Sequence, residues 1–405
     1  MKVLMLFHSA LYPPVSGVIK RNLHMFQEAA SRHEVSIIVQ GEQDEQAFRE
    51  HFGHLFREMV CIPVRRSVLR ARLQTIFYLL TGRSEARRLY LRKTQHVLDD
   101  MLARDHYDLV HLSTPFMFYY RFPKGTTIVC DTHNVEYDNV QRMYREAHSL
   151  FRRFFFLLIY RAIRRDEIRN LRESNVIMAT SERDASMFRK DLPEKSFVVV
   201  PNGVDDKNFS PRRQSTIPDS MVFTGLMEYY PNEQGVLYFM EKVFPLILQQ
   251  VPSATISIVG AKPSIRVTRW ASSKVEVTGY VEDVRPYLAR AQVVIIPLWI
   301  GGGTRLKALE AVAMKKSIVS TSIGCEGISF THGKDILIAD TPETFAAAVV
   351  RLFRDPRLRE SLAESAFANL LPSYRWEAIG EKLDEAYQLA AKGSCDEAIA
   401  QLTEH

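Results

Sequence analysis

The sequence has few cysteines and no long apolar run. Its four cysteines are spread over 405 residues without a Cys-x-x-Cys pair, which argues against a disulfide scaffold or zinc module and favours a reducing compartment. No stretch of 18 apolar residues occurs, so no bilayer-spanning helix is expected. The apolar start, residues 1–7, is short for a signal peptide and is followed by His8, Pro13 and Pro14. It predicts a first β-strand in a cytoplasmic protein.

Several motifs of nucleotide and metal chemistry are also missing. No Gly-Lys-Ser/Thr ending marks a Walker loop, and no Gly-x-Gly-x-x-Gly fingerprint follows the first expected strand. The C-terminal half has no Asp-x-Asp pair, and no metal site or cofactor is expected. The composition, 46% apolar and 25% charged, is that of an ordinary globular protein, and the length suggests two domains.

The positive charge is concentrated in the first half of the chain. The net charge is +6, yet residues 1–200 contain 31 Lys and Arg against 23 Asp and Glu, and the remainder contains 22 against 24. Such asymmetry indicates an anionic partner for the first half: a membrane surface, a nucleic acid or a phosphorylated acceptor.

Short β-rich runs alternate with amphipathic stretches in both halves, which predicts parallel strands joined by helical crossovers. Expected strands are 2–7, 34–39, 109–112, 127–130, 176–179, 197–200, 221–224, 255–259, 275–278, 293–297, 317–320 and 336–338. Expected helices are 20–31, 86–102, 234–250, 284–289, 304–314 and 344–353. The pattern restarts after residue 205, so we expect an α/β protein of two doubly wound domains joined near residues 201–211.

A glycine-rich loop precedes one of these helices. Gly301-Gly302-Gly303-Thr304 follows an expected strand, with Arg305 and Lys307 just beyond. Glycines allow close backbone approach, and a helix start carries unpaired N–H groups, so the combination suits a diphosphate. The alternative is structural: a tight turn, a Thr304 N-cap and a solvated ion pair between Lys307 and Glu310.

This loop and several motifs in order resemble family 4 retaining glycosyltransferases, which have the GT-B fold. The loop and its helix, Gly301–Met314, resemble the donor-sugar loop and helix. The other matching stretches are Tyr12-Pro13-Pro14-Val15-Ser16-Gly17 with Arg21, Asp131-Thr132-His133-Asn134-Val135-Glu136-Tyr137, Ser181–Asp184, Pro201–Asp205, Phe223–Gly225 and Val277–Val281 with Asp283-Val284.

The resemblance implies two Rossmann-like domains facing a cleft. The acceptor side would be residues 1–203, joined by a C-terminal helix at about 374–390 that crosses back, and the donor side residues 204–372. It implies retaining transfer of a hexose from a UDP- or GDP-linked sugar to a saccharide or lipid-linked saccharide, in cell-surface polysaccharide or glycolipid synthesis. The implied catalytic residues are His133, Arg305 and Lys307; the donor-binding residues Gly17, Gly225, Tyr280, Val281, Gly302, Gly303, Thr304 and Glu310; and the acceptor-side residues Arg21, Asn134 and Glu136.

The sequence departs from the family pattern at three places. Gly302 replaces the first glutamate of a Glu-x7-Glu pattern, of which Glu310 matches the second, ribose-binding member. Leu226 and Asn232 replace an Arg and a Lys that contact the phosphates in many members, and we expect Arg305 and Lys307 to restore that charge. Lys315-Lys316-Ser317 stands where relatives often have Gly and Pro, so the donor helix is expected to end differently.

Two basic segments stand out in the first half. Residues 64–93 contain nine basic residues and one acid, and residues 149–172 place aromatic and aliphatic residues between arginine pairs. Both compositions favour peripheral binding at an anionic membrane surface, the inner face of the plasma membrane. The alternative is that the aromatics of 149–172 are core and the arginines solvated. No nucleic-acid motif accompanies the charge.

Two other functional classes remain open from the sequence. A sugar-nucleotide epimerase of the same fold would bind the donor but release it isomerised. A catalytically silent scaffold, favoured by Gly302, would bind no donor at all.

Overall fold

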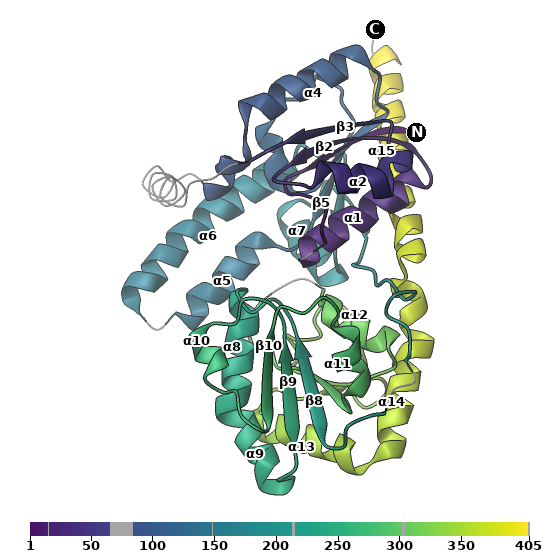
Figure 1. The fold of residues 1–405 in the computed structure, drawn as a ribbon. Helices are drawn as coiled ribbons and strands as arrows, with labels where there is room; N and C mark the ends of the chain where they lie inside the picture. Colours follow the sequence, from purple (N-terminus) through teal and green to yellow (C-terminus); the bar gives the residue numbers. More distant parts are fainter. Residues whose placement is uncertain (15, 65–83, 148, 213–214, 302–303, 404–405) are drawn as a thin grey trace. The chain divides into compact units, whose positions relative to one another are not determined.

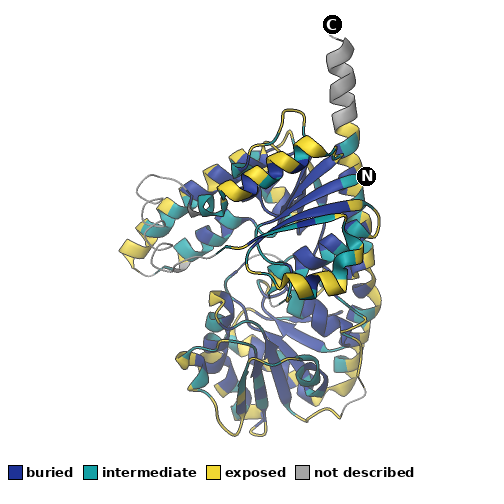
Figure 2. Cartoon of the chain, turned by 45° about the horizontal axis from the view of Figure 1, so that its top comes forward, coloured by how far each residue is buried: buried dark blue, intermediate teal, exposed yellow. Residues whose placement is uncertain are grey.

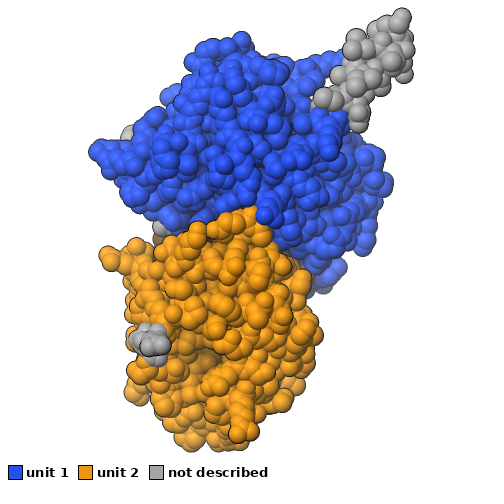
Figure 3. Space-filling view, turned by 90° about the vertical axis from the view of Figure 1, so that its right-hand side faces the viewer, with its two compact units in different colours: residues 1–201, 379–405 blue, residues 202–378 orange. Residues whose placement is uncertain are grey.

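The structure is a computed structural model that describes residues 1–14, 16–64, 84–147, 149–212, 215–301 and 304–403. The side chains of residues 85, 146 and 394–403 are outside this description. The chain divides into two compact units, residues 1–201 with 379–405 and residues 202–378, which Figure 3 distinguishes by colour.

Unit 1 is built on a seven-stranded sheet in which every neighbouring pair is parallel. Its order is β3-β2-β1-β4-β5-β6-β7. The strands are β1 (Lys2–Phe7), β2 (Glu34–Gln40), β3 (Glu58–Ile62), β4 (Leu109–Leu112), β5 (Ile128–Thr132), β6 (Val176–Ala179) and β7 (Ser196–Val199). Because helices cover both faces, as Figure 1 shows, the central strands are buried along nearly their whole length.

The connections of unit 1 are mostly helical. Its α-helices are α1 (Gly17–Ala30), α2 (Glu45–Phe52), α4 (Arg92–Arg104), α5 (Glu136–Glu146), α6 (Leu150–Leu171) and α7 (Glu182–Asp191). Short 3-10 turns are η1 (Gly53–Leu55), η2 (Glu85–Leu89) and η3 (Pro115–Tyr119). The Ser16 hydroxyl accepts from Ile19 N at 3.4 Å and so caps α1.

Unit 2 repeats the design with a six-stranded parallel sheet, in the order β10-β9-β8-β11-β12-β13. The strands are β8 (Ser220–Thr224), β9 (Thr255–Val259), β10 (Val275–Gly279), β11 (Val293–Ile296), β12 (Ser317–Ser320) and β13 (Leu337–Ile338). The helices are α8 (Tyr230–Tyr238), π-helical η4 (Phe239–Val243), α9 (Phe244–Gln250), α10 (Ile265–Thr268), α11 (Arg285–Arg290), α12 (Leu306–Ala313), α13 (Pro342–Arg354), α14 (Pro356–Asn369) and the 3-10 turn η5 (Leu371–Tyr374).

The last helix, α15 (Trp376–Thr403), begins in unit 2 and continues in unit 1. Within unit 1 its residues Ile379, Leu383, Ala386, Tyr387 and Ala390 are buried. Figure 2 shows the dark blue interiors of the sheets and the exposed outer faces of the helices. Within the described part of the chain, no helix combines the length and apolar character needed to cross a membrane.

The expected two-sheet α/β architecture is confirmed, with differences in detail. Strand β3 was not expected from the sequence. The expected helix 86–102 is broken at Tyr90 and Leu91, because the Tyr120 hydroxyl donates to Leu89 O (2.8 Å) and accepts from Leu91 N (2.9 Å). The expected helix 234–250 is three consecutive segments, with a π-turn directly before Phe244-Pro245.

Candidate functional site

Each sheet has one point at which the strand order reverses, and ligands of open parallel sheets bind beyond the carboxyl ends of the strands there. In unit 1 the reversal lies between β1 and β4, and in unit 2 between β8 and β11. His8 follows β1 and Ser113 follows β4, while Gly225 follows β8 and the loop 297–305 follows β11. Of the residues singled out from the sequence, Gly225 and Arg305 therefore lie at the reversal point of unit 2.

Lys307 is the centre of the unit 2 cluster. Its Nζ donates to Asn232 Oδ1 at 2.8 Å and lies 4.0 Å from the centre of the Phe223 ring. The Asn232 amide in turn donates to Leu226 O at 2.8 Å. Burial, and next the positive charge of Arg305, lower the pKa of Lys307 to about 7. An anion at this point would favour the charged form of Lys307.

The role of Asn232 as a hydrogen-bond partner of Lys307 was not predicted from the sequence. The sequence showed it only as the loss of a family lysine, whereas the structure shows it holding Lys307, which lies 75 positions further along the chain. The only sequence signal was that Asn232 stands where many family members have a phosphate-contacting lysine, while Lys307 offers a cation on another loop.

Two glycines make the close approach possible. A Cβ on Gly225 would lie 2.8 Å from Lys307 Nζ and 2.8 Å from Asn232 Nδ2. Gly260 has φ +151°, and a Cβ there would lie 1.8 Å from Gly225 O. The turn after β8 therefore requires glycine at 260, whereas glycine at 225 leaves room for the Lys307–Asn232 pair as it stands. The sequence pointed to the loop that begins at Gly260 as one of several loops after strands, but not to this role.

The loop before α12 places further charge beside Lys307. Arg305 and Glu310 are each 8% exposed, and both charges act on Lys307. A Cβ on Gly301, which has φ +118°, would lie 3.0 Å from the Arg305 guanidinium. Thr304 is buried, and its carbonyl accepts from Asn202 Nδ2 at 3.4 Å. Gly302 and Gly303 lie outside the described residues.

The structure does not bring every expected donor residue into this cluster. Tyr280 and Val281 follow β10, with Tyr280 72% exposed and Val281 half-buried. Gly17 opens α1 in unit 1 and is exposed. Within the described part of unit 2, no hydrogen bond, ion pair or ring contact joins Tyr280 or Val281 to Lys307.

The expectation that the donor helix ends differently is wrong. Lys315 adopts φ +50°, in the left-handed region that glycine usually fills. Lys316 N donates to Ala311 O and Lys315 N to Val312 O, both at 2.9 Å, the two hydrogen bonds of a Schellman motif. The Lys315 ammonium also pairs with Glu364 at 2.8 Å. The helix therefore ends as it would with glycine.

His133 follows β5 in unit 1 and is neutral at pH 7, since burial lowers its pKa to about 4. Its ring hydrogen bonds to the backbone of Ser113. The Ser113 N–H already donates to Leu6 O, so the ring donates to the Ser113 carbonyl. Nε2 is buried and, within the described part of the chain, has no hydrogen-bond partner. The assigned tautomer therefore leaves an Nε2 lone pair that can accept from a hydroxyl.

Arg21 takes a different position from the expected contact with an acceptor. It is 1% exposed, and its guanidinium binds both oxygens of Asp131, at 2.9 and 2.7 Å. It also donates to Val200 O (2.9 Å) and Pro201 O (3.0 Å) at the end of unit 1. A guanidinium so enclosed is not available to an acceptor. It keeps the pKa of the buried Asp131 below its ordinary value and supports the segment that leads to His133.

Glu167 holds the beginning of α5. It is fully buried on α6, and its two oxygens accept from the backbone N–H groups of Glu136 and Tyr137, both at 3.1 Å. Burial and the nearby Glu136 raise its pKa well above the ordinary value. Asn134 Nδ2 donates to Glu136 Oε1 at 3.3 Å. The sequence did not single out Glu167, because nothing local distinguishes it from the solvated charges of the same helix.

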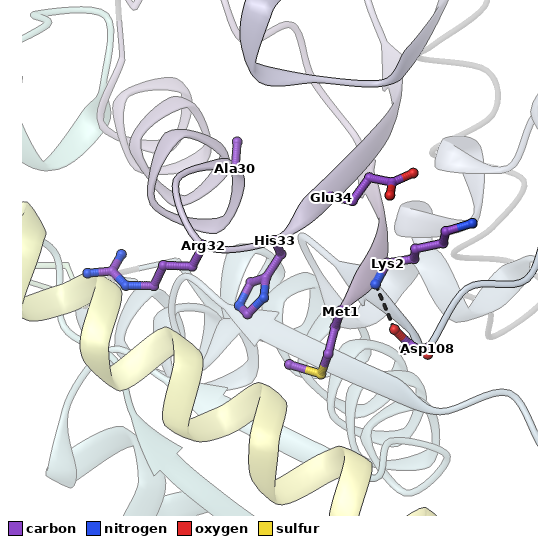
Figure 4. A pocket seen from close by; sticks show the side chains of 7 residues that line it. All are labelled: Met1, Lys2, Ala30, Arg32, His33, Glu34 and Asp108. Carbon is purple, nitrogen blue, oxygen red and sulfur yellow. Dashed lines mark hydrogen bonds between the residues drawn. The ribbon is translucent and has the colours of Figure 1, made fainter.

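A hollow of about 480 Å³ lies at the opposite edge of the unit 1 sheet. Figure 4 shows its lining, which includes Met1, Arg32, His33 and Lys2, whose backbone N–H donates to Asp108 at 2.7 Å. These residues stand at the amino ends of β1 and β2. Ligands of such sheets bind at the carboxyl ends, so this hollow is not the candidate site.

Comparisons with known proteins agree with this architecture. The family described as "Glycosyltransferase Family 4" matches residues 15–208, and "Glycosyl transferases group 1" matches residues 218–355. An uncharacterised 44.6 kDa protein in the cps region of Klebsiella pneumoniae is 21% identical over 298 residues, covering 70% of this chain and 74% of that protein.

Two solved structures illustrate the shared fold. Sucrose-phosphate synthase from Thermosynechococcus elongatus is 16% identical with a TM-score of 0.71, covering 96% of this chain and 98% of that one. Anabaena HepE, solved in complex with UDP-glucose, is 14% identical with a TM-score of 0.63, covering 95% and 98%. Together with the two parallel-sheet units, the family matches identify the chain as a glycosyltransferase of the GT-B type, similar to family 4.

Proposed function

We propose that the protein transfers a hexose from a UDP- or GDP-linked sugar to a saccharide or lipid-linked saccharide, with retention at the anomeric carbon. The observation that carries the proposal is the Lys307–Asn232 pair beside Gly225, at the carboxyl edge where β8 and β11 meet. HepE binds UDP-glucose, which supports a nucleotide sugar as the donor class. The retaining stereochemistry and the role in cell-surface polysaccharide or glycolipid synthesis rest on the family resemblance.

The proposed chemistry needs charge stabilisation at the leaving group. As the bond between the sugar C1 and the diphosphate oxygen breaks, the electron pair passes to the diphosphate. The oxygen of the acceptor hydroxyl forms the new bond to C1, and its proton passes to the departing diphosphate. Arg305 and Lys307 would meet the developing negative charge with preorganised donors. Nε2 of His133, in unit 1, would accept from a sugar hydroxyl. Glu310, in unit 2, would bind the ribose hydroxyls.

The test begins with donor binding and ends with turnover. A screen of UDP- and GDP-sugars should find one that raises the melting temperature, because a ligand bound to the native state stabilises it. With that donor, Arg305→Met and Lys307→Met should each lower turnover about a hundredfold, since losing one such donor costs about 2.7–4 kcal/mol. Lys262→Met, an exposed lysine of the same unit paired with Glu228, is the matched control.

The outcomes separate the alternatives. Normal turnover in both the Arg305 and Lys307 variants would reject the charge assignment. A protein stabilised by no sugar nucleotide would be a catalytically silent scaffold. Release of an isomerised sugar nucleotide without acceptor would identify an epimerase instead.

A further inference from the structure

The beginning of α6 exposes an apolar row to solvent. Leu150, Phe151 and Phe154 have exposed fractions of 82, 78 and 61%, and Leu158 follows at 37%. Leu150, Phe154 and Leu158 are four residues apart, and Phe151 lies beside them on the same helical face. We call residues 150–158 the α6 tip; Figure 2 shows the first turn of this helix in yellow.

The second half of the same helix is structural. Ala162, Ile163, Asp166, Glu167 and Asn170 are buried. Its arginines have acidic neighbours: Arg164 pairs with Asp191, Arg165 with Asp166 at 3.2 Å, and Arg172, just after the helix, with Glu194 at 3.4 Å. Before residue 161 the helix has two faces: Phe156, Ile159 and Tyr160 are partly buried against the unit 1 core, whereas the row that begins at Leu150 is exposed.

The stretch of chain that forms the α6 tip carries charge of one sign. Residues 147–165 contain five arginines and no aspartate or glutamate. Arg152 and Arg153 alternate with these apolar residues in sequence but lie to the sides of the row around the helix. Both are exposed, and the Arg153 guanidinium lies 5.0 Å from the Tyr144 ring centre on α5. A surface with bulky apolar side chains between uniformly positive ones matches the boundary of an anionic bilayer, where acyl chains lie beneath phosphate groups.

We propose that the α6 tip docks on the surface of a bilayer that contains anionic lipid. Phe151, Phe154 and Leu150 would enter the boundary between headgroups and acyl chains, while Arg152 and Arg153 meet the lipid phosphates. This inference is independent of the proposed glycosyl transfer, because it requires neither donor nor acceptor. The other basic segment, residues 64–93, is not part of this proposal. Its residues 65–83 lie outside the described residues, and its Arg87 lies 3.9 Å from the buried Asp166.

The test is sedimentation of the full-length protein with vesicles. Mixed phosphatidylglycerol–phosphatidylcholine vesicles are compared with pure phosphatidylcholine, each at low and high salt. Binding should require phosphatidylglycerol and weaken as salt rises, because salt screens the arginine–phosphate attraction. Recovery of the protein in the supernatant under all four conditions would overturn the proposal.

Matched variants assign the binding to the tip. Leu150→Ser and Ile265→Ser remove equally exposed side chains, each 82% exposed, from α6 and from α10. Leu150→Ser combined with Phe151→Ser should lower the vesicle partition coefficient at least about tenfold, since each large apolar side chain withdrawn from water contributes on this scale. Ile265→Ser should leave the partition coefficient within about twofold of wild type.

A second pair of variants tests the charge. Arg152→Gln with Arg153→Gln should reduce binding to anionic vesicles, whereas Lys242→Gln with Arg266→Gln, exposed cations of unit 2, should not. Because the tip side chains are exposed, all variants should keep the wild-type melting temperature. If both tip variants partition onto vesicles as the wild type does, the α6 tip is not the membrane-binding surface. If the wild type is a dimer and Leu150→Ser/Phe151→Ser is a monomer with unchanged vesicle binding, a second copy of the chain covers the tip instead.

Discussion

Lys307 is a buried cation whose charge is decided near neutral pH. Burial and Arg305 lower its pKa to about 7, while Glu310 acts in the opposite direction. A bound diphosphate would raise that pKa again, so the protonated form is the one that binds. Below pH 7 Lys307 is already charged, whereas at higher pH binding must be accompanied by proton uptake.

Donor affinity should therefore fall as the pH rises from 7 towards 9, by as much as about tenfold per pH unit. The measurement is calorimetry with an intact nucleotide sugar, in two buffers of different ionisation enthalpy to count the protons taken up. Lys307→Arg, which stays charged throughout, should give a flat profile. Lys316 has a pKa lowered to about 8 by burial and titrates in the same range. Because Lys307→Arg still contains Lys316, any effect of Lys316 on donor affinity would persist in that variant. An equally steep decline in Lys307→Arg would contradict the assignment.

Lys315 occupies a backbone conformation that glycine adopts without strain. Its φ of +50° ends α12, and its side chain pairs with Glu364 and lies 4.6 Å from the Phe367 ring centre. Lys315→Gly and Lys315→Ala both remove these side-chain contacts, but only glycine relieves the backbone. The glycine variant should be the more stable by about 1 kcal/mol in urea unfolding. Equal stability of the two variants would show that the left-handed conformation carries no cost here.

Glu167 connects two neighbouring helices through backbone hydrogen bonds. On α6, it accepts from the first N–H groups of α5, whose N-cap residue Val135 supplies no side-chain bond. These N–H groups follow directly on the segment that carries His133. Glu167 is therefore a positioning residue in our interpretation, because it contacts the backbone rather than the reacting atoms.

Glu167→Ala should destabilise the protein by about 1–3 kcal/mol, since it leaves buried donors unsatisfied. It should also lower kcat by disturbing the His133 segment, while Glu167→Gln, which keeps one acceptor oxygen, should recover part of both effects. Glu173→Ala, an exposed carboxylate just after the same helix, serves as the control in urea unfolding and steady-state kinetics. A loss of stability in Glu167→Ala with kcat unchanged would leave only a structural role.

Helices and strands could be predicted from the sequence where their burial requires a recognisable pattern of apolar residues. Strands such as β1 and β11 are continuous apolar runs, because helices cover both faces of the sheet. Edge strand β3 was missed although its residues 59–62 are also consecutive apolar residues, and it is only partly buried. The break before α4 depends on Tyr120, 29 positions further along the chain from Leu91.

The candidate site was less predictable, because its decisive contacts are long-range. Motif order placed Gly225, Arg305 and Lys307 in the same part of the fold, and the structure has these residues near the edge of unit 2. The same reasoning assigned Arg21 to the acceptor, since it could not show an ion pair with Asp131 110 positions away. Asn232, Gly260 and Glu167 act through contacts that only the folded chain reveals.

At the scale of the whole molecule, the chain leaves unit 1 after residue 201 and returns to it at residue 379. The returning part of α15 supplies Tyr387, which is 0% exposed and whose hydroxyl lies 2.6 Å from His111 Nδ1 on β4. The core of unit 1 is thus completed only by residues from the end of the chain.

Tyr387→Ala should lower the free energy of unfolding by about 3–5 kcal/mol, the range for removing a large buried aromatic side chain. Unit 1 should be the unit that is destabilised. Leu389→Ala, on the same helix but 41% exposed, should be close to neutral. Hydrogen exchange during urea titration follows the two units separately. Equal loss of protection in the sheet of unit 2 would mean that the units unfold as one.

The close fit of Gly260 against Gly225 has a consequence for how this protein tolerates random change. In a scan of all substitutions, position 260 would tolerate change as poorly as a residue that takes part in the reaction. Its only role, however, is to make room for the turn after β8. Gly279, with φ +71° but open space around its missing Cβ, would meet only the backbone strain of a left-handed conformation and no clash. A low score at position 260 would therefore report on the folding of this turn and not on contact with the donor.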